Sequence, residues 1–272
     1  MADSPSQKIK DRKKSILITG AHGQLGSTFQ NLSKNYGDLH FIFCSSKKLD
    51  VTHKESVQEI FKEFNPDFCI NCAAYTNVEQ AEKEPDQAFK INAEGVKNLA
   101  EICKEYQTTL IHISTDYVFD GKKRRPYSVD DLPNPINQYG KSKLKGEQYI
   151  QDILTEYVIV RTSWLYSKEF GNNFYKTILR KAKTEKELFI TDAQTGCPTD
   201  TVNLATKILS KIEENTEDYG VFHFCDREEM TWYGFSKQIL TENDLREIKV
   251  IKDNTYKTIA ERPIYSVLEV NF

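Results

Sequence analysis

The feature that most constrains the fold lies near the start of the chain, where an apolar run is followed at once by a glycine-rich turn. Residues 15–19 read S-I-L-I-T, which has the length and composition of a buried strand. The turn G-A-H-G-Q-L-G follows at 20–26, and a helical pattern then runs to Ser33. Glycines here let the backbone approach a pyrophosphate closely, and the N-terminus of the next helix directs N–H groups at it. The stretch predicts an α/β fold with a dinucleotide-binding loop.

The alternation of strands and helices continues along the chain. Further strands are predicted at residues 40–44, 67–71, 109–113, 157–160 and 221–225, with helices at 53–64, 89–106, 173–183, 202–212 and 232–240. Strands separated by helices favour right-handed crossovers and a parallel sheet covered on both faces. We therefore expect an α/β, Rossmann-like, doubly wound parallel sheet with a small C-terminal substrate-binding lobe. The expected divisions are a disordered lead-in at 1–14, an NAD(P)-binding domain with the catalytic helix at 15–160, and a substrate-binding lobe, interleaved with the sheet, over most of 161–272.

The end of the second predicted strand indicates which cofactor the loop would hold. In folds that prefer NAD, an acidic residue at this place binds the ribose hydroxyls. This chain reads C-S-S-K-K at 44–48, which offers hydroxyls and ammonium groups in place of a carboxylate. A 2′-phosphate would not be repelled there, so the sequence favours NADPH, with NADH as the alternative.

A tyrosine and a lysine four residues apart form the candidate catalytic pair. In Y-G-K-S-K at 139–143, a helical backbone would place Tyr139 and Lys143 on one face, a single turn apart. An ammonium group beside a phenol favours phenolate, so we expect Lys143 to lower the pKa of Tyr139 and make it a general acid. Thr115 follows the strand at 109–113 and could hydrogen-bond a substrate carbonyl. The plainer interpretation of the pair is a solvated helix face.

Composition narrows the classes of function. The formal net charge is -3 with mixed signs, which argues against a nucleic-acid binder. No apolar run approaches the length of about 20 residues that spans a bilayer, and the N-terminus lacks the apolar core of a signal peptide, so we expect a cytoplasmic protein without membrane contact. Cys69 and Cys72 lie at an odd spacing that points them to opposite faces of a strand. They are predicted to be core thiols, and no metal site is predicted.

Eight segments in order resemble the dTDP-4-dehydrorhamnose reductase family of the extended short-chain dehydrogenase/reductase superfamily. The resemblance covers about residues 15–268. Its segments are G-A-H-G-Q-L-G (20–26), N-C-A-A-Y-T-N-V-E-Q-A-E (71–82), I-S-T-D-Y-V-F-D-G (113–121), Y-G-K-S-K (139–143), R-T-S-W-L-Y (161–166), G-N-N-F (171–174), D-A-Q-T-G-C-P-T (192–199) and R-P-I-Y-S-V-L (262–268).

This resemblance implies an enzyme that transfers hydride from NADPH to C4 of a nucleotide-linked 4-keto-6-deoxy sugar, giving dTDP-L-rhamnose from dTDP-4-dehydro-L-rhamnose. Tyr139 would protonate the new alkoxide, Lys143 would bind the nicotinamide ribose, and Thr115 would orient the keto oxygen. The implied substrate contacts are Thr115, Asp116, Tyr117, Trp164, Asn173 and Gln194. The implied cofactor contacts are Gly20, His22, Gly23, Gln24, Leu25, Gly26, Ser45, Ser46, Asp50, Val51, Ala73, Ala74, Tyr75, Tyr139 and Lys143.

Alternatives remain open at this point. Similar dehydratases carry Asp-Glu after the threonine, whereas this chain has Asp116-Tyr117, so dehydration is not expected. A non-catalytic NADP-binding regulatory subunit, like that of methionine adenosyltransferase, also resembles the family. A reductase of a UDP-linked or talose-series sugar is the third alternative. The expected partner is the nucleotide sugar, and the expected state is a monomer or a homodimer.

Three departures from the family pattern bear on these expectations. Thr28 stands where some members have a glutamate that helps to bridge a dimer through magnesium, so that metal and that dimer are not expected. Members usually continue with a further helix after R-P-x-x-S-x-L, whereas the printed sequence ends at Phe272, which predicts a weaker substrate lobe. Tyr265 replaces a frequent asparagine.

Overall fold

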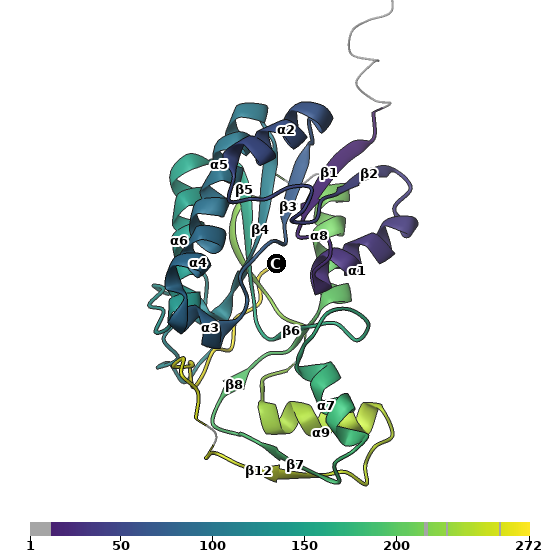
Figure 1. Cartoon of the computed structure of the whole chain (residues 1–272), viewed down its shortest axis with the longest axis vertical. Coiled ribbons are helices and arrows are strands. Elements are labelled where there is room, and N and C mark those ends of the chain that lie inside the picture. Colours follow the sequence, from purple (N-terminus) through teal and green to yellow (C-terminus); the bar gives the residue numbers. More distant parts are fainter. Residues whose placement is uncertain (1–11, 215–216, 227, 256) are drawn as a thin grey trace, which may run out of the picture.

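A six-stranded parallel sheet forms the centre of the molecule (Figure 1). The computed structural model describes residues 12–214, 217–226, 228–255 and 257–272, so most of the predicted lead-in at 1–14 lies outside the described residues. The strand order is β10-β5-β4-β3-β1-β2. The strands are β1 Lys14–Thr19, β2 Leu39–Phe43, β3 Phe68–Asn71, β4 Thr109–Thr115, β5 Tyr157–Thr162 and β10 Gly220–Phe224. The chain passes from β1 to β2 on one side and to β3 on the other, which makes a topological switch point between β1 and β3.

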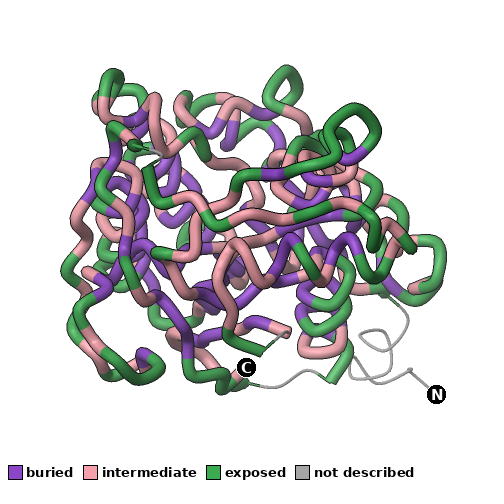
Figure 2. Tube along the Cα trace, turned by 90° about the horizontal axis from the view of Figure 1, so that it is seen from below, coloured by how far each residue is buried: buried purple, intermediate pink, exposed green. Residues whose placement is uncertain are grey.

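Helices cover both faces of this sheet, as the alternating pattern predicted. The helices on one face are α2 Lys54–Phe64, α5 Gly95–Tyr106 and α6 Gln138–Ile153, and those on the other are α1 Gln24–Leu32 and α8 Thr201–Glu214 (Figure 1). Each face has its own apolar core, and buried segments run through the middle of the trace in Figure 2. Cys69 packs in one core and Cys72 against the other, which confirms that the two thiols face opposite ways. The doubly wound fold is confirmed.

The helix predicted at 89–106 begins with a π-helical turn, and two short helices that were not predicted come before it. The structure has α3 Val78–Lys83, α4 Pro85–Phe89, a π-helical turn at Lys90–Glu94 and then α5. The turn places Asn92 under the loop after β3, where its side chain accepts from Tyr75 N at 2.8 Å and donates to Tyr75 O at 3.0 Å. π-helical turns occur frequently at functional sites, and this one fixes the loop that borders the switch point.

The segments after β5 alternate between a lobe and the sheet. The lobe contains α7 Phe174–Ala182, β7 Glu187–Ile190, α9 Trp232–Glu242 and β12 Lys249–Lys252, packed around an aromatic core that includes Tyr166, Tyr175 and Phe235. Short two-residue pairs connect it to the sheet: β6 Leu165–Tyr166 with β9 Thr199–Asp200, and β8 Thr195–Gly196 with β11 Met230–Thr231. Among the described residues there are also two 3-10 turns, Ser33–Asn35 and Asp116–Val118. In the described part of the chain, none of the helices has the length and apolarity needed to cross a membrane.

A buried ion pair ties α6 to β5. Both oxygens of Glu147 face the guanidinium of Arg161, with Oε2 2.7 Å from Nη2 and Oε1 3.1 Å from Nε. Glu147 is 0% exposed and Arg161 is 4% exposed. Ser114 also donates to Glu147, and Nη1 of Arg161 lies 3.4 Å from Nε2 of His223. This network fixes the register of α6, which carries the candidate catalytic pair.

Removal of the cationic partner tests this network. The variant Arg161→Met should lower the free energy of unfolding by about 3–5 kcal/mol, because Glu147 would remain buried without its partner. The measurement is urea denaturation at neutral pH. The exposed pair Lys249–Glu187 provides the control: Lys249→Met should cost about 1 kcal/mol or less. Equal losses in the two variants would contradict a structural role for the buried pair.

Candidate active site

The glycine loop brings the backbone of β1 against the loop after β3. Gly20 has φ +60, and a Cβ there would lie 2.7 Å from Ala73 N. A Cβ on Gly26 would overlap the Gly20 carbonyl oxygen, so the start of α1 needs a glycine to pack on the turn. α1 begins at Gln24, and its N-terminal N–H groups therefore face the switch point. The predicted dinucleotide loop has the conformation that close approach to a pyrophosphate requires.

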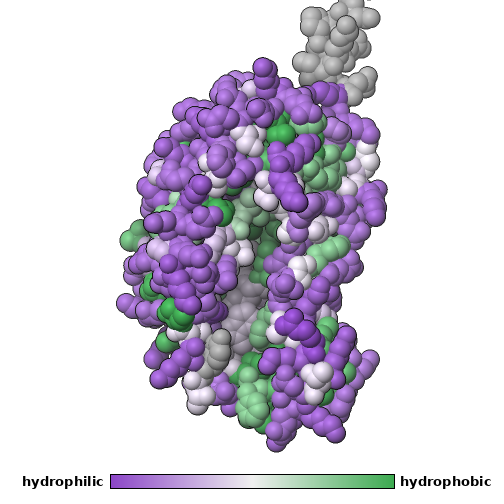
Figure 3. Space-filling view, in the orientation of Figure 1, coloured by the Kyte–Doolittle hydropathy of each residue, from purple (hydrophilic) through white to green (hydrophobic). Residues whose placement is uncertain are grey.

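Two adjoining cavities open at the carboxyl ends of the strands. The first has a volume of about 430 Å³ and lies over the β1 and β2 ends, and the second has a volume of about 550 Å³ and reaches into the lobe. They share Gly23, Cys72 and Ala74. In Figure 3 a hollow with white and green side chains runs down the middle of the molecule between hydrophilic flanks. The two cavities together form one elongated trough, with room for a dinucleotide and a second ligand.

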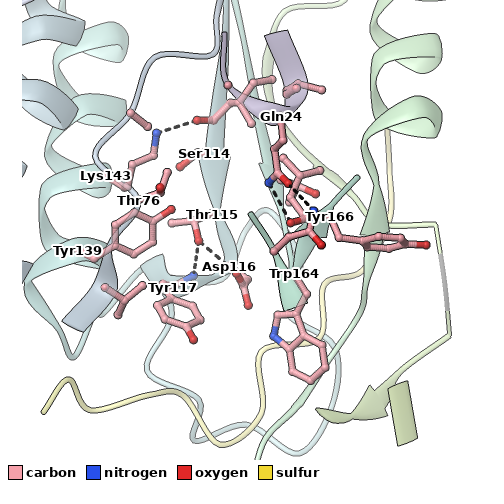
Figure 4. A pocket seen from close by; sticks show the side chains of 18 of the residues that line it. Gln24, Thr76, Ser114, Thr115, Asp116, Tyr117, Tyr139, Lys143, Trp164 and Tyr166 are labelled. Carbon is pink, nitrogen blue, oxygen red and sulfur yellow. Dashed lines mark hydrogen bonds between the residues drawn. The ribbon is translucent and has the colours of Figure 1, made fainter. Parts of the chain in front are cut away.

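The predicted helix that carries Tyr139 and Lys143 is confirmed as α6. Asn137 caps it by accepting from Gly140 N at 2.8 Å, which fixes the first turn beside the larger cavity. Tyr139 points from α6 into this cavity on the same side as Thr115 and Thr76 (Figure 4). Lys143 is only 2% exposed, and its Nζ donates to Ile113 O at 2.7 Å and lies 3.2 Å from His112 Nε2. Both side chains line the cavity wall.

The predicted effect of the lysine on the tyrosine is wrong for the protein without ligands. Burial raises the pKa of Tyr139, and the hydrogen bond with Thr115 lowers it only in part. Burial also lowers the pKa of Lys143 to about 8. The amine of Lys143 points toward the strand carbonyl and not toward the phenol (Figure 4). Loss of water around both groups therefore outweighs their attraction, because desolvation disfavours each charged form.

The 3-10 turn after β4 places three predicted substrate contacts on the cavity wall. The Thr115 hydroxyl donates to Asp116 Oδ1 at 3.1 Å and accepts from Tyr117 N at 3.2 Å. Ser163 donates to the other oxygen of Asp116 at 3.2 Å. Burial raises the pKa of Asp116 to about 6. The ring of Tyr117 stands edge-on to that of Tyr139, with 5.9 Å between centroids. These groups form a polar rim around the phenol.

Trp164 stands at the lobe side of the cavity, stacked on a second tryptophan. The ring centroids of Trp164 and Trp232 are 3.5 Å apart, with planes 6° from parallel. Trp164 has φ 46, a left-handed backbone that is uncommon for a bulky residue. A Cβ on Gly196 would lie 2.6 Å from Cε2 of this indole. The chain thus keeps Trp164 in a strained, tightly fitted position at the cavity, which often marks a ligand contact.

Comparisons with known proteins agree with this geometry. The family model described as the RmlD substrate binding domain matches residues 14–271. The chain belongs to this family. A dTDP-4-dehydrorhamnose reductase of Aggregatibacter actinomycetemcomitans is 37% identical over 266 residues, 94% of this chain and 90% of the relative. A dTDP-4-keto-6-deoxy-D-glucose reductase of Streptomyces niveus is 34% identical over 255 residues, 93% of this chain and 87% of the relative. A crystal structure of dTDP-4-dehydrorhamnose reductase from Bacillus anthracis, in complex with NADP, superimposes with a TM-score of 0.91 at 39% identity, covering 96% of this chain and 92% of that one.

Most predicted contacts of this RmlD-family chain line the trough, and four do not. Those that line it are Gly20, His22, Gly23, Gln24, Leu25, Ser46, Asp50, Val51, Ala73, Ala74, Thr115, Asp116, Tyr117, Tyr139, Lys143, Trp164 and Asn173. Gly26 packs behind the loop and Ser45 lies beside it. The backbone of Tyr75 is bonded to Asn92. Gln194 accepts from Trp232 Nε1 at 3.0 Å, so it supports the indole pair and does not line the trough.

Several lining residues of the trough were missed from the sequence. They are Asn71, Thr76, Ser114, Phe174, Trp232 and Arg262, together with Gln87 and Lys90 near the nucleotide end. Asn71 is the last residue of β3 and Ser114 the penultimate residue of β4, and that position near the strand ends was the available signal. Arg262 lies in the R-P-I-Y-S-V-L segment and is held by Glu79, whose Oε1 is 2.8 Å from Nη2. No local pattern could have predicted this contact, since 183 residues separate the partners.

Thr28, one of the expected departures from the family pattern, and Asn173 both connect parts of the RmlD-family chain. Thr28 is buried, donates to Gln24 O at 2.8 Å and has its hydroxyl 2.9 Å from that of Thr201, so it binds α1 to α8. A side chain in that place faces the interior of this chain. Asn173 caps α7 by accepting from Lys176 N at 3.0 Å and also donates to Gln24 at 3.3 Å. The glycine loop and the lobe are therefore joined directly at the trough.

Crowding at Gly196 provides a test of the indole pair. Gly196→Ala should displace Trp164 and remove the exciton signal of the stacked indoles from the circular dichroism spectrum, with a stability loss of about 1–3 kcal/mol from overpacking. The chain has 2 tryptophans, so the signal reports on this pair alone. Gly234→Ala is the control, because its Cβ would meet no atom closer than 3.6 Å. An unchanged exciton signal in Gly196→Ala would contradict the observed packing.

Proposed function

We propose that this protein reduces the C4 ketone of a nucleotide-linked 4-keto-6-deoxy sugar with NADPH, converting dTDP-4-dehydro-L-rhamnose to dTDP-L-rhamnose. The observation that carries the proposal is the position of Tyr139. Its phenol projects into a cavity beside Thr115, and that cavity is continuous with the one over the glycine loop. A proton donor at the junction of a dinucleotide site and a second site is the arrangement that carbonyl reduction needs. The names of the relatives supply the sugar.

The residues of the trough fit the cofactor. Gly20 and Gly26 permit the close approach of a pyrophosphate, and the N-terminus of α1 supplies N–H donors and a favourable dipole. Ser46 and Asp50 line the end of the trough over β2, where the adenosine half would lie. Asp50 Oδ1 already accepts from Thr52 N at 2.9 Å, and Oδ2 lies 3.0 Å from His53 Nδ1. The hydroxyl of Ser46 remains for a 2′-phosphate. When bound, NADPH supplies the hydride.

The chain's own residues would handle the proton. The Tyr139 hydroxyl donates to the keto oxygen and passes its proton to that oxygen as the oxygen becomes an alkoxide. Its raised pKa keeps the phenol protonated before the reaction. The Thr115 hydroxyl also donates to the keto oxygen. This second hydrogen bond fixes the orientation of the ketone and stabilises the negative charge that develops on the oxygen. Lys143 holds the nicotinamide ribose and carries the charge that supports the resulting phenolate. In total, the ketone gains one hydride and one proton and becomes an alcohol.

The sugar nucleotide would lie between the turn after β4 and the lobe. Asp116 and Tyr117 offer an acceptor and a donor for sugar hydroxyls, and the indole of Trp164 offers an apolar face. Asn173 and Phe174, which line the cavity at the start of α7, would lie near the nucleotide. A ligand in this place displaces water from Tyr139 and Lys143, which strengthens every electrostatic contact in the trough.

The setting of the proposed reaction follows from the chain's chemistry. All six cysteines are free thiols, which suits a reducing compartment, and we place the protein in the cytoplasm as a monomer or a homodimer. The nucleotide sugar is its expected partner. We expect no nucleic-acid partner.

Replacement of the phenol tests the activity. With NADPH and freshly generated dTDP-4-dehydro-L-rhamnose, Tyr139→Phe should lower kcat by about 10²–10⁴, because the proton donor is lost. Nucleotide oxidation is followed by absorbance, and NADPH binding by fluorescence should stay near the wild-type value. A Tyr36→Phe variant is the control and should keep full activity, because Tyr36 lies past the C-terminal end of α1 and does not line the trough. A wild-type protein that binds NADPH but never oxidises it would favour the regulatory-subunit alternative.

A charge at the β2 end tests the cofactor preference. Ser46→Asp should weaken NADPH relative to NADH by about tenfold, since one repulsive contact with the 2′-phosphate is expected to cost about 1.4 kcal/mol. The ratio of kcat/KM values for the two cofactors is the measurement. Ser46→Asn has the same size without the charge and should change the ratio much less. If both variants keep the wild-type ratio, the 2′-phosphate does not lie at Ser46.

A further inference from the structure

A chain of buried hydrogen bonds crosses the sheet from the glycine loop to the catalytic lysine. Thr19 donates to Asn71 Oδ1 at 2.6 Å, Asn71 Nδ2 lies 3.0 Å from His112 Nδ1, and His112 Nε2 lies 3.2 Å from Lys143 Nζ. The four residues come from β1, β3, β4 and α6 and are at most 2% exposed. They are thus shielded from solvent. The roles already assigned to Lys143 do not account for the three residues behind it.

The orientation of the Asn71 amide is fixed by a backbone group. Ala73 N lies 3.2 Å from Asn71 Oδ1 and 3.3 Å from Thr19 Oγ1. An N–H group needs acceptors, so the atom of Asn71 that faces Ala73 and Thr19 is the oxygen. If the amide were reversed, its NH₂ would face the N–H of Ala73, donor against donor. The NH₂ of Asn71 is therefore directed at His112.

The amide in turn fixes the tautomer of the histidine. Because Asn71 Nδ2 is a donor, His112 Nδ1 must be an acceptor and carries no proton. A neutral imidazole then has its proton on Nε2, the atom that faces Lys143. Burial and the charge of Lys143 both disfavour the imidazolium, which lowers the pKa of His112. His112 thus presents an N–H donor to the amine.

Lys143 can accept that hydrogen bond only as a neutral amine. Its Nζ donates to Ile113 O at 2.7 Å, and a lone pair on the same nitrogen would receive Nε2–H of His112. An ammonium group would instead face another donor. We propose that His112, held in the Nε2–H tautomer by Asn71, is a positioning residue that stabilises the neutral form of Lys143 and so sets the pH range of the reductase. This inference rests on the proposed function.

The other groups around Lys143 do not reverse this balance. Glu147, one turn along α6, favours the ammonium form, but its carboxylate is already paired with Arg161. Cys72, after β3, remains a thiol because burial raises its pKa. Tyr139, on the same helix face, is a neutral phenol. From β4 the amine meets only the Ile113 carbonyl and His112.

The arrangement determines which group limits the reaction at alkaline pH. If ribose binding and support of the phenolate need the ammonium, activity and NADPH affinity fall as Lys143 loses its proton, near its lowered pKa of about 8. Tyr139 ionises at higher pH. The alkaline limb of kcat/KM should therefore follow Lys143, and it should move when the hydrogen-bond partner of His112 changes.

The variant Asn71→Asp reverses the direction of the hydrogen bonds from residue 71 through His112 to Lys143, with almost no change in side-chain shape. A carboxylate can still accept from Thr19 and Ala73 with one oxygen, while its other oxygen accepts from His112 Nδ1–H. His112 Nε2 then becomes an acceptor for an ammonium. The alkaline limb, measured with NADPH and dTDP-4-dehydro-L-rhamnose, should rise by about one pH unit or more. His112→Gln is the conservative control, because its amide can accept from Asn71 and donate to Lys143; its limb should stay at the wild-type pH.

Two further readouts separate this inference from the proposed function. In ¹⁵N-histidine NMR of the ligand-free protein, the His112 signal, assigned by its loss in His112→Gln, should show the Nε2–H tautomer in wild type and the Nδ1–H tautomer in Asn71→Asp. NADPH binding followed by fluorescence against pH should show the same shift of the limb without turnover. A wild-type Nδ1–H tautomer, no tautomer change in Asn71→Asp, or a tautomer change without a shift of either limb would each overturn the inference. None of these results depends on which sugar is reduced.

Discussion

The site depends on the burial of one amine. Lys143 is 2% exposed between α6 and the ends of β3 and β4. Burial there makes its charged form less stable, and the neighbouring groups compensate for part of that loss. A carbonyl and an imidazole satisfy its nitrogen, and Glu147 stands one turn away in a pair with Arg161. Because burial lowers the pKa of the Lys143 amine to about 8, the amine can gain or lose its proton near neutral pH. The same loss of water holds the phenol of Tyr139 neutral, which is the state that the proposed proton transfer requires.

Close packing of α6 makes that burial possible. Gly140 lies against the carbonyl of Tyr117 and Gly146 against the carbonyl of Asn92, and a Cβ at either glycine would overlap the oxygen. The helix can therefore approach both the turn after β4 and the π-helical turn before α5. The glycine loop shows the same device at Gly20 and Gly26. Backbone approaches of this kind position the trough, while the lobe that closes its other end is joined through the contact of Asn173 with Gln24.

Much of the fold could be predicted because its signals are local. An apolar run, a glycine turn and a helical pattern suffice to specify the first βα unit, and repetition of the pattern implies a parallel sheet. The rule that ligands bind at the carboxyl ends of the strands then located the loops after β1, β3 and β4. The π-helical turn at 90–94 was not predicted, because a single turn is too short to show in the sequence pattern and depends on Asn92 reaching Tyr75 and Ser142. The contact of Gln194 with the indole of Trp232, 38 residues away, was not predicted either, and its predicted contact with substrate stays a prediction.

The sequence by itself determined the class of fold, the glycine loop, the helix that carries Tyr139 and Lys143, and the resemblance that the family comparison confirmed. Each of these follows from residues close together in the chain, whose spacing sets their direction. Only the tertiary structure decided the charge states. The spacing of Tyr139 and Lys143 predicted an ammonium beside a phenol and a lowered tyrosine pKa. The folded protein instead removes water from both groups and turns the amine of Lys143 toward β4. The burial of Tyr139 and Lys143 and the tautomer of His112 depend on atoms from strands and helices that lie far apart in the sequence. No local sequence pattern could have predicted them.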